Sequence, residues 1–481
     1  LAIDYIDIPK LLESKISISQ ISTRNNFVTL TQTDTTNKNT KPFKIPEIYP
    51  TMQIEIGGIN IVNTNFKYDK MGKKKHLLAH LNFDIKLDSL KAIKGARFHL
   101  ATNTVDSRFR VYDFSFDLPD SLNTIGFDTL LVSSRKSQID LTNFTLTARY
   151  PKYEYGNQVG HQVDWKDLLF KRVKVENIDF VKLIEDKTLK CQKITLENGH
   201  LKLFKDKQLP FPKDRVVPIL QERVKGLKMP LKIDSIEIKN FDIYQSTLQS
   251  TGLQEGGITF MDTEALITNV TNDSIRLENN KMLSVVASSQ IMGSGNLFAE
   301  MNFDMLDVNN LFFFDARLGS MDAKAFNNIL EAAAFVKVKN GEIRSLNLHA
   351  TGNKKYAYGD MSFIYNDLKI ETINKKTLET KGMGKVLKTF FANAFVVKKN
   401  NSRIKFITRR GGMYYERNTG RITLDYMAKT ALSGVVSSIG AKSNRKQIKQ
   451  ITKDNKAARD LELKQQKELD KAAKKKAKKE Q

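Results

Sequence analysis

The chain contains residues able to bind metals or carry out catalysis, but their spacing does not form a recognisable metal or catalytic site. His76 and His80 are the histidine pair at the spacing that a helix uses to bind a metal. They lie in a segment whose apolar residues alternate as in a strand, and no third ligand is nearby. We therefore expect surface histidines and no bound metal here.

A glycine-rich segment and the single cysteine have ordinary structural interpretations. The Gly382-Met-Gly-Lys385 segment is similar to a phosphate loop, but the spacing is wrong and Val386 replaces the required hydroxyl residue. A flexible entry to a helix is favoured instead. Cys191 is the only cysteine and lies within a strand pattern, so we expect it to pack in a core, and no intrachain disulfide is possible.

Carboxylates are plentiful, but they alternate with apolar residues as the solvent-facing side of strands. Asp84, Asp88, Asp113 and Asp117 follow this pattern. No G-x-S-x-G nucleophile motif occurs in the sequence. We predict that the protein is not an enzyme and uses no cofactor.

The charge of the chain is strongly basic and uneven. Lys and Arg number 78 against 53 Asp and Glu, which gives a net charge of +25. Residues 442–481 hold 15 basic and 6 acidic residues, a net charge of +9, so +16 remains for the other 441 residues. Nucleic acid is disfavoured as a partner because this tail lacks aromatic residues for base stacking and no recognition motif occurs. We expect a solvated tail; contact with anionic lipid headgroups is the alternative.

The sequence contains no run of about 18 apolar residues that would cross a membrane as a helix. It begins at Leu1, inside an alternating segment. We expect an N-terminal piece to precede it, either a processed signal or a membrane anchor.

Residues 341–372 show the clearest secondary-structure pattern and predict one long hairpin. Leu346 and Leu348 alternate with polar residues before a turn at Gly352-Asn353, and Met361 and Phe363 alternate after it. Because side chains of a strand point to opposite faces with a period of two, this hairpin has one apolar face.

The same strand pair recurs along the chain. Residues 52–68 and 231–244 share two I-x-I pairs, an Asn and a closing aromatic residue, and return strands follow at 81–87 and 258–270. Chance repetition in a β protein remains an alternative. Helices are predicted at 218–227, 322–336, 384–397 and 424–439, while 164–170 is too short to assign.

The fold class that we predict is mainly β with a few helices (α+β), as an elongated, curved antiparallel sheet with helices near the C-terminus. Its apolar side either closes against a second sheet in a sandwich or remains accessible as a groove. A groove would accept lipid acyl chains, since burying each CH₂ contributes about 0.8 kcal/mol. The candidate lining residues are Ile54, Ile56, Leu81, Phe83, Ile85, Ile236, Ile238, Leu346, Leu348, Met361 and Phe363.

Several short segments of the C-terminal third resemble the AsmA-like proteins of diderm bacterial envelopes, which are relatives of TamB. The matching segments, in order, are 321–330, 338–343 and the hairpin that follows, with Tyr365-Asn-Asp-Leu368, then 391–393, 399–401, 415–417 and 432–434. Residues 116–146 are similar to the β region of the same family. The tail after Lys442 has no counterpart.

The resemblance implies a curved β structure with an apolar groove, anchored to the inner membrane by an N-terminal helix and facing the periplasm. It implies a role in phospholipid traffic or outer-membrane biogenesis, with phospholipid and outer-membrane assembly proteins as partners. We divide the chain into β-groove regions at 1–160 and 161–318, an AsmA-like region at 319–441 and a basic tail at 442–481. The alternative is an envelope scaffold with a closed β core and no ligand.

Overall fold

The computed structural model describes residues 1–33, 48–71, 76–98, 102–212, 214–373, 380–381, 398–401, 408–457, 460, 464 and 467. The prediction of a mainly β fold is confirmed, with 56% strand and 18% helix. The chain forms two compact units. Unit 1 comprises Leu1–Lys213, Gln221–Phe298 and Asn328–Ala333, and unit 2 comprises Asp214–Leu220, Ala299–Asn327 and Ala334–Gln481.

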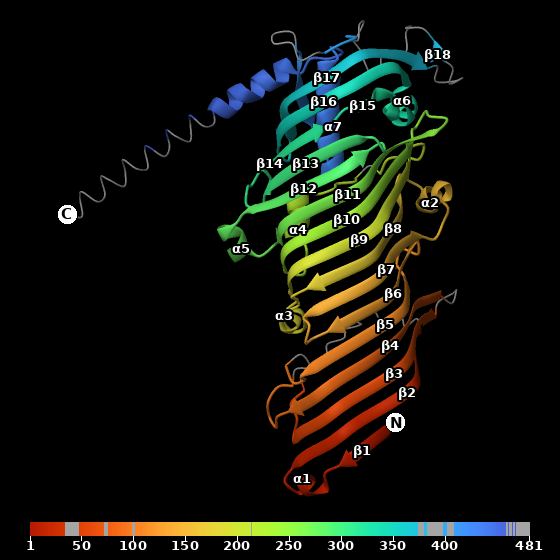
Figure 1. The fold of residues 1–481 in the computed structure, drawn as a ribbon, viewed down its shortest axis with the longest axis vertical. Helices are drawn as coiled ribbons and strands as arrows, with labels where there is room; N and C mark the ends of the chain where they lie inside the picture. Colours follow the sequence, from red (N-terminus) through yellow and green to blue (C-terminus); the bar gives the residue numbers. More distant parts are fainter. Residues whose placement is uncertain are drawn as a thin grey trace, which may run out of the picture. The chain divides into compact units, whose positions relative to one another are not determined.

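The strands of unit 1 form an open sheet in which β1 to β12 pair in chain order (Figure 1). The predicted strands at 52–68, 81–87, 231–244 and 258–270 are β3, β4, β10 and β11. The bounds are β1 (Ala2–Ile6), β2 (Lys15–Thr33), β3 (Gln53–Met71), β4 (His76–Ala92), β5 (Asp106–Asp117), β6 (Asn123–Ser133), β7 (Gln138–Ala148), β8 (Asp164–Glu176), β9 (Leu189–Asp206), β10 (Leu231–Leu248), β11 (Glu255–Thr271) and β12 (Met282–Ile291).

The sheet is mainly antiparallel, as predicted, but two neighbouring pairs are parallel. β2 pairs with β3 in parallel, and β9 pairs with β10 in parallel. A parallel pair needs a connection of a dozen or more residues. The sequence has 19 residues between Thr33 and Gln53 and 24 residues between Asp206 and Leu231, which is long enough in both cases.

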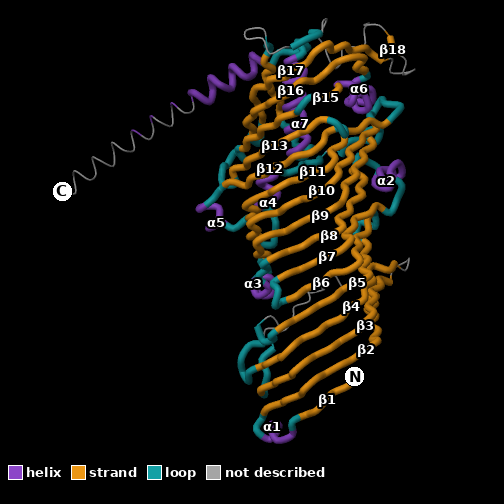
Figure 2. Tube along the Cα trace, viewed as in Figure 1, coloured by secondary structure: helices purple, strands orange, loops and turns teal. Residues whose placement is uncertain are grey.

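The short helices of unit 1 lie at the ends of strands (Figure 2). They are α1 (Ile8–Leu12), α2 (Lys152–Val159), α3 (Phe180–Glu185) and α5 (Ser274–Asn279). In α1, α3 and α5 an aspartate precedes the helix, and its carboxylate accepts a hydrogen bond from a backbone N–H of the first turn. The predicted helix at 218–227 is α4 (Leu220–Lys225).

Unit 2 contains the predicted hairpin, as β16 (Val336–Gly352) and β17 (Tyr356–Ile373). Leu346 pairs directly with Phe363, and Leu348 pairs with Met361. The other strands are β14 (Phe312–Leu318), β15 (Met321–Asp322), β18 (Thr380–Lys381) and β19 (Arg410–Glu416), and β13 (Gly295–Asp304) has residues in both units.

The helices predicted at 322–336 and 424–439 are confirmed. The first is a 3-10 turn, η1 (Ala323–Phe326), continued by α6 (Asn327–Ala334), and the second is α7 (Thr423–Ser438). α7 packs closely on the sheet of unit 2 at Gly434, where an added Cβ would lie 2.5 Å from Met413 Cγ and 3.0 Å from Met361 Cε. A larger residue would push the helix away from the sheet. The helix predicted at 384–397 lies outside the described residues.

Candidate functional site

Two continuous rows of apolar side chains cross the sheet of unit 1, and we call them together the apolar face. Each member is the direct cross-strand partner of the next, from β3 to β12. The first row is Ile61, Ile85, Phe109, Val132, Ile139, Val175, Ile194, Ile236, Ile267 and Val285. The second is Thr64, Phe83, Val111, Leu130, Leu141, Val173, Leu196, Ile238, Ala265 and Ala287.

The apolar face is only half-buried. Every member of the two rows is partly exposed except Thr64, which is 2% exposed. All the described strands of unit 1 belong to the same sheet, so no second sheet of this unit covers the face. In a closed sandwich the central residues of such rows would be buried. The described strands of unit 1 therefore form an open sheet and not a sandwich.

A row of left-handed residues keeps the apolar side chains in phase. Strands β2, β3, β5, β7, β9, β10 and β11 each carry an Asn or Asp with a positive φ near the middle of the strand. These residues, which we call the kink row, are Asn25, Asn63, Asp113, Asn143, Asn198, Asn240 and Asp262, with φ between 48° and 56°. Asn and Asp tolerate this conformation better than other side chains. Each inserts one residue, so the apolar spacing changes from two to three and the same face stays apolar.

Side-chain hydrogen bonds join members of the kink row. Asn63 Nδ2 donates to Asn25 Oδ1 at 2.7 Å, and Asn240 Nδ2 donates to Asn198 Oδ1 at 2.7 Å. The backbone N–H of Asn63 also donates to Asp84 Oδ1 at 2.8 Å. These bonds satisfy polar groups that the irregular backbone would otherwise leave without strand partners.

Aromatic rings on the apolar face follow the kink row. Phe114 stacks on Phe127 with 4.5 Å between ring centroids, and Phe170 stacks on Phe241 at 4.8 Å. The second pair closes over Gly199, which is the cross-strand partner of both rings. A Cβ at Gly199 would lie 2.0 Å from the Leu169 carbonyl oxygen, so glycine is required at this close approach.

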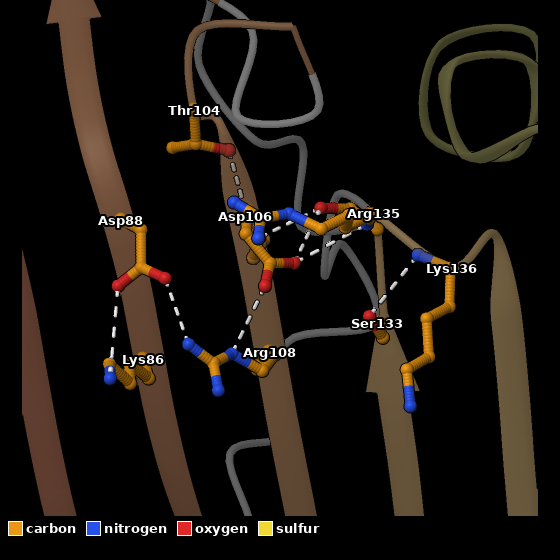
Figure 3. A network of polar contacts seen from close by, with 10 residues as sticks. Lys86, Asp88, Thr104, Asp106, Arg108, Ser133, Arg135 and Lys136 are labelled. Atoms are coloured by element: carbon orange, nitrogen blue, oxygen red, sulfur yellow. Dashed lines mark hydrogen bonds and ion pairs between the residues drawn. The ribbon is translucent and has the colours of Figure 1, made fainter.

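The opposite face of the sheet carries charged side chains in cross-strand contacts. Arg108 bridges two aspartates, with Nη2 at 2.8 Å from Asp88 Oδ2 and Nε at 3.1 Å from Asp106 Oδ2 (Figure 3). Asp106 Oδ1 also accepts the backbone N–H of Arg135 at 3.3 Å. A hollow of about 600 Å³ lies beside this network. Asp88, one of the carboxylates predicted to face solvent, thus holds Arg108 in place.

Ion pairs of the same kind occur farther along this polar face. Arg172 pairs with Asp140, and Lys193 pairs with Glu237. The hydrogen bond from Lys193 lowers the pKa of Glu237, and the same contact raises the pKa of Lys193. Both groups are charged at neutral pH, so this side of the sheet is wetted while the other is apolar.

The predicted lining residues separate into two sets in the structure. Ile54, Ile56, Leu81, Phe83, Ile85, Ile236 and Ile238 lie in unit 1 and are half-buried, and Leu346 of unit 2 is also half-buried. The other three, in unit 2, are buried: Leu348 is 7% exposed, Met361 0% and Phe363 6%. Met361 lies under α7, so these positions contribute to a packed core of unit 2.

Cys191 packs in a core, as its strand pattern predicted. Cys191 is 3% exposed and packs with Ile178 and Ile233, and burial raises the pKa of its thiol to about 11. It is therefore protonated at neutral pH and is a poor nucleophile. His80 lies 3.2 Å from the amide nitrogen of Asn65, and the side chain of His76 lies outside the described part of the chain.

The part of the chain that the structure describes holds no group of three or more His, Cys, Asp or Glu side chains placed to bind a metal. Within those same residues, none of the helices combines the length and the apolar character needed to span a bilayer. Comparison with protein-family models and with curated protein sequences gives no match.

The kink row is the feature that the sequence patterns did not lead us to predict. Its signal is present as a recurring pattern, Φ-x-Φ-x-[N/D]-Φ-x-Φ, where Φ is apolar. Strand β5 shows it as Phe109, Val111, Asp113, Phe114 and Phe116. Strict alternation breaks at the Asn or Asp, so a search for period two alone ends each strand too early.

Proposed function

We propose that the protein is a non-enzymatic lipid carrier that holds phospholipid acyl chains against the apolar face of unit 1. The observation that supports this function most strongly is that two cross-strand rows remain partly exposed at every apolar position, with only Thr64 buried. Soluble proteins rarely expose large continuous apolar patches without a binding partner.

The size and energy of the apolar face suit acyl chains. Ten strands spaced by about 4.8 Å extend over about 43 Å, compared with about 30 Å for the hydrocarbon core of a bilayer. Burying each CH₂ contributes about 0.8 kcal/mol, so a 16-carbon chain gains on the order of 10 kcal/mol before entropy losses. Apolar contact alone therefore suffices for binding.

The cellular setting of this proposal comes from the resemblance to AsmA-like proteins. It implies a periplasmic protein anchored at the inner membrane, where lipid held on the apolar face would contribute to outer-membrane biogenesis. The second candidate is an envelope scaffold whose apolar face is covered by a partner protein. It is favoured by the ion pairs of the polar face, which strengthen a sheet without contributing to lipid binding.

Extraction of lipid from the purified protein tests the proposal. Phospholipid should be recovered by organic solvent from the native protein, and Phe83→Asp should reduce this recovery because it places a charge in the second apolar row. Leu131→Asp is the matched control. Leu131 is 48% exposed and pairs with Arg110 and Asp140 on the opposite face.

The result is interpretable because both substitutions replace a partly exposed residue and should leave the fold intact, as circular dichroism would show. Loss of lipid in Phe83→Asp but not in Leu131→Asp supports lipid binding on the apolar face. A gently purified native protein that contains no phospholipid would contradict the proposal and favour the scaffold.

A further inference from the structure

The first part of the basic C-terminal tail is a helix that packs on unit 2. Residues 445–457 are helical, and Asn444, just before them, is 3% exposed. Its Nδ2 donates to the Gly412 carbonyl oxygen at 2.8 Å, and Ile451, one residue of the helix, is 7% exposed. Farther along, Asn455 Nδ2 donates to the Tyr358 hydroxyl at 3.0 Å. These contacts fix which side of the helix faces the protein.

The positive charges lie on a different side of this helix. With about 100° of rotation per residue, the contacting residues Asn444, Ile448, Ile451 and Asn455 fall within an arc of about 60°. The basic residues fall within a separate arc of about 100°, centred about 140° away. The five within residues 445–457 are all exposed: Arg445, Lys446, Lys449, Lys453 and Lys456.

We propose that this cationic side of the helix is a docking surface for an anionic lipid bilayer. Because the helix packs on unit 2, its charged side chains are already aligned before a membrane binds. A free tail would lose conformational entropy on binding, and this helix avoids that cost. Each Lys or Arg near an anionic membrane contributes about 1 kcal/mol, or a factor of about five in affinity. Five aligned cations therefore provide strong, salt-dependent attraction.

A bilayer fits this surface better than nucleic acid does. Residues 442–481 contain no Phe, Tyr or Trp, so no base can stack there. Lysines outnumber arginines 13 to 2 in this stretch, and lysine acts as a point charge without the planar fork that recognises bases. The docking surface is separate from the apolar face, and the inference holds whether or not that face carries lipid.

Vesicle co-sedimentation with the full chain tests the inference. The protein should bind vesicles that contain phosphatidylglycerol, release them as salt is raised, and bind pure phosphatidylcholine weakly. Replacing Lys446, Lys449, Lys453 and Lys456 with Glu should lower binding to anionic vesicles by about a hundredfold or more. A control with the same change in net charge replaces four exposed lysines of unit 1 with Glu, at Lys94, Lys166, Lys171 and Lys228.

The two quadruple variants distinguish a local docking surface from a general effect of net charge. Equal loss of vesicle binding in both would show that only net charge matters and would overturn the inference. So would tighter binding to an oligonucleotide than to anionic vesicles. Phe83→Asp should bind vesicles as the native protein does, so a failure of lipid carriage on the apolar face is recognised independently of this result.

Discussion

Deleting a single residue of the kink row should be far more damaging than replacing it, and Asn240 is the best position for this test. Its φ is 49°, its side chain donates to Asn198 Oδ1, and its backbone N–H donates to Glu264 Oε1 at 2.9 Å. The next residue, Phe241, is 5% exposed and stacks on Phe170. Deletion would place Phe241 and Ile243 on the polar face, because a shift of one residue reverses every side chain of a strand.

The expected magnitudes follow from these contacts. Deletion loses the burial of Phe241 and part of that of Ile243, which is about 3–5 kcal/mol. Asn240→Val keeps the insertion but costs about 1–2 kcal/mol for a left-handed backbone and about 1 kcal/mol for the lost hydrogen bond. Asn240→Gly tolerates the positive φ and should cost less than about 1 kcal/mol.

Peptide-resolved hydrogen exchange is the suitable assay because two units need not unfold together. Protection of the amides of β10 should fall in the order native, Asn240→Gly, Asn240→Val, deletion. Lipid recovery should fall sharply in the deletion variant alone. If deletion and Asn240→Gly gave equal protection in β10, the kink row would not be setting the phase of the apolar face.

Two further predictions concern packed side chains. Met361 is 0% exposed, so Met361→Ala should destabilise unit 2 by about 2–5 kcal/mol in urea unfolding. Lipid recovery from unit 1 should not change. Unchanged stability would contradict the packed core under α7. Burial raises the pKa of Cys191 from 9.0 to about 11, so the folded state favours the neutral thiol. Its stabilising contribution is complete below about pH 9 and is lost as pH rises toward 11, by up to about 1.4 kcal/mol per pH unit. Comparison with Cys191→Ala over pH 8–11 measures this loss, and identical slopes for the two proteins would refute it.

Local patterns predicted the elements because the sheet of each unit is built mostly from neighbours in the sequence. The hairpin at 341–372 and the pair β3 and β4 follow from alternation, which reports directly on a one-sided sheet. The parallel pair β9 and β10 was missed, since strand direction depends on where a crossover returns and not on the strand's own residues. The burial of Met361 under α7 was also not predicted, because alternation shows that a face is apolar without showing what covers it.

The sequence predicted several residues of the apolar face, but not that they form continuous rows across the sheet. The residues Phe83 and Ile85 were identified as apolar lining, and the structure places them in neighbouring rows. Their continuity across the sheet depends on left-handed positions such as Asn63 and Asp113, whose role appears only when each strand is aligned with its partners. The predicted strands at 52–68 and 231–244 include Asn63 and Asn240, but alternation alone gave these residues no structural role.

The physical argument for a ligand depends on a difference between the strands of unit 1 and those of unit 2. In unit 2 the chain covers the apolar side with α7, and Gly434 permits an approach so close that Met361 is fully buried. In unit 1 the same kind of strand carries rows of apolar side chains that stay half-buried, and α1, α2, α3 and α5 lie at strand ends. Seven left-handed residues keep these rows on one face, and each is energetically unfavourable by itself. Because no second sheet of the described residues covers this face, we propose that a guest molecule covers it.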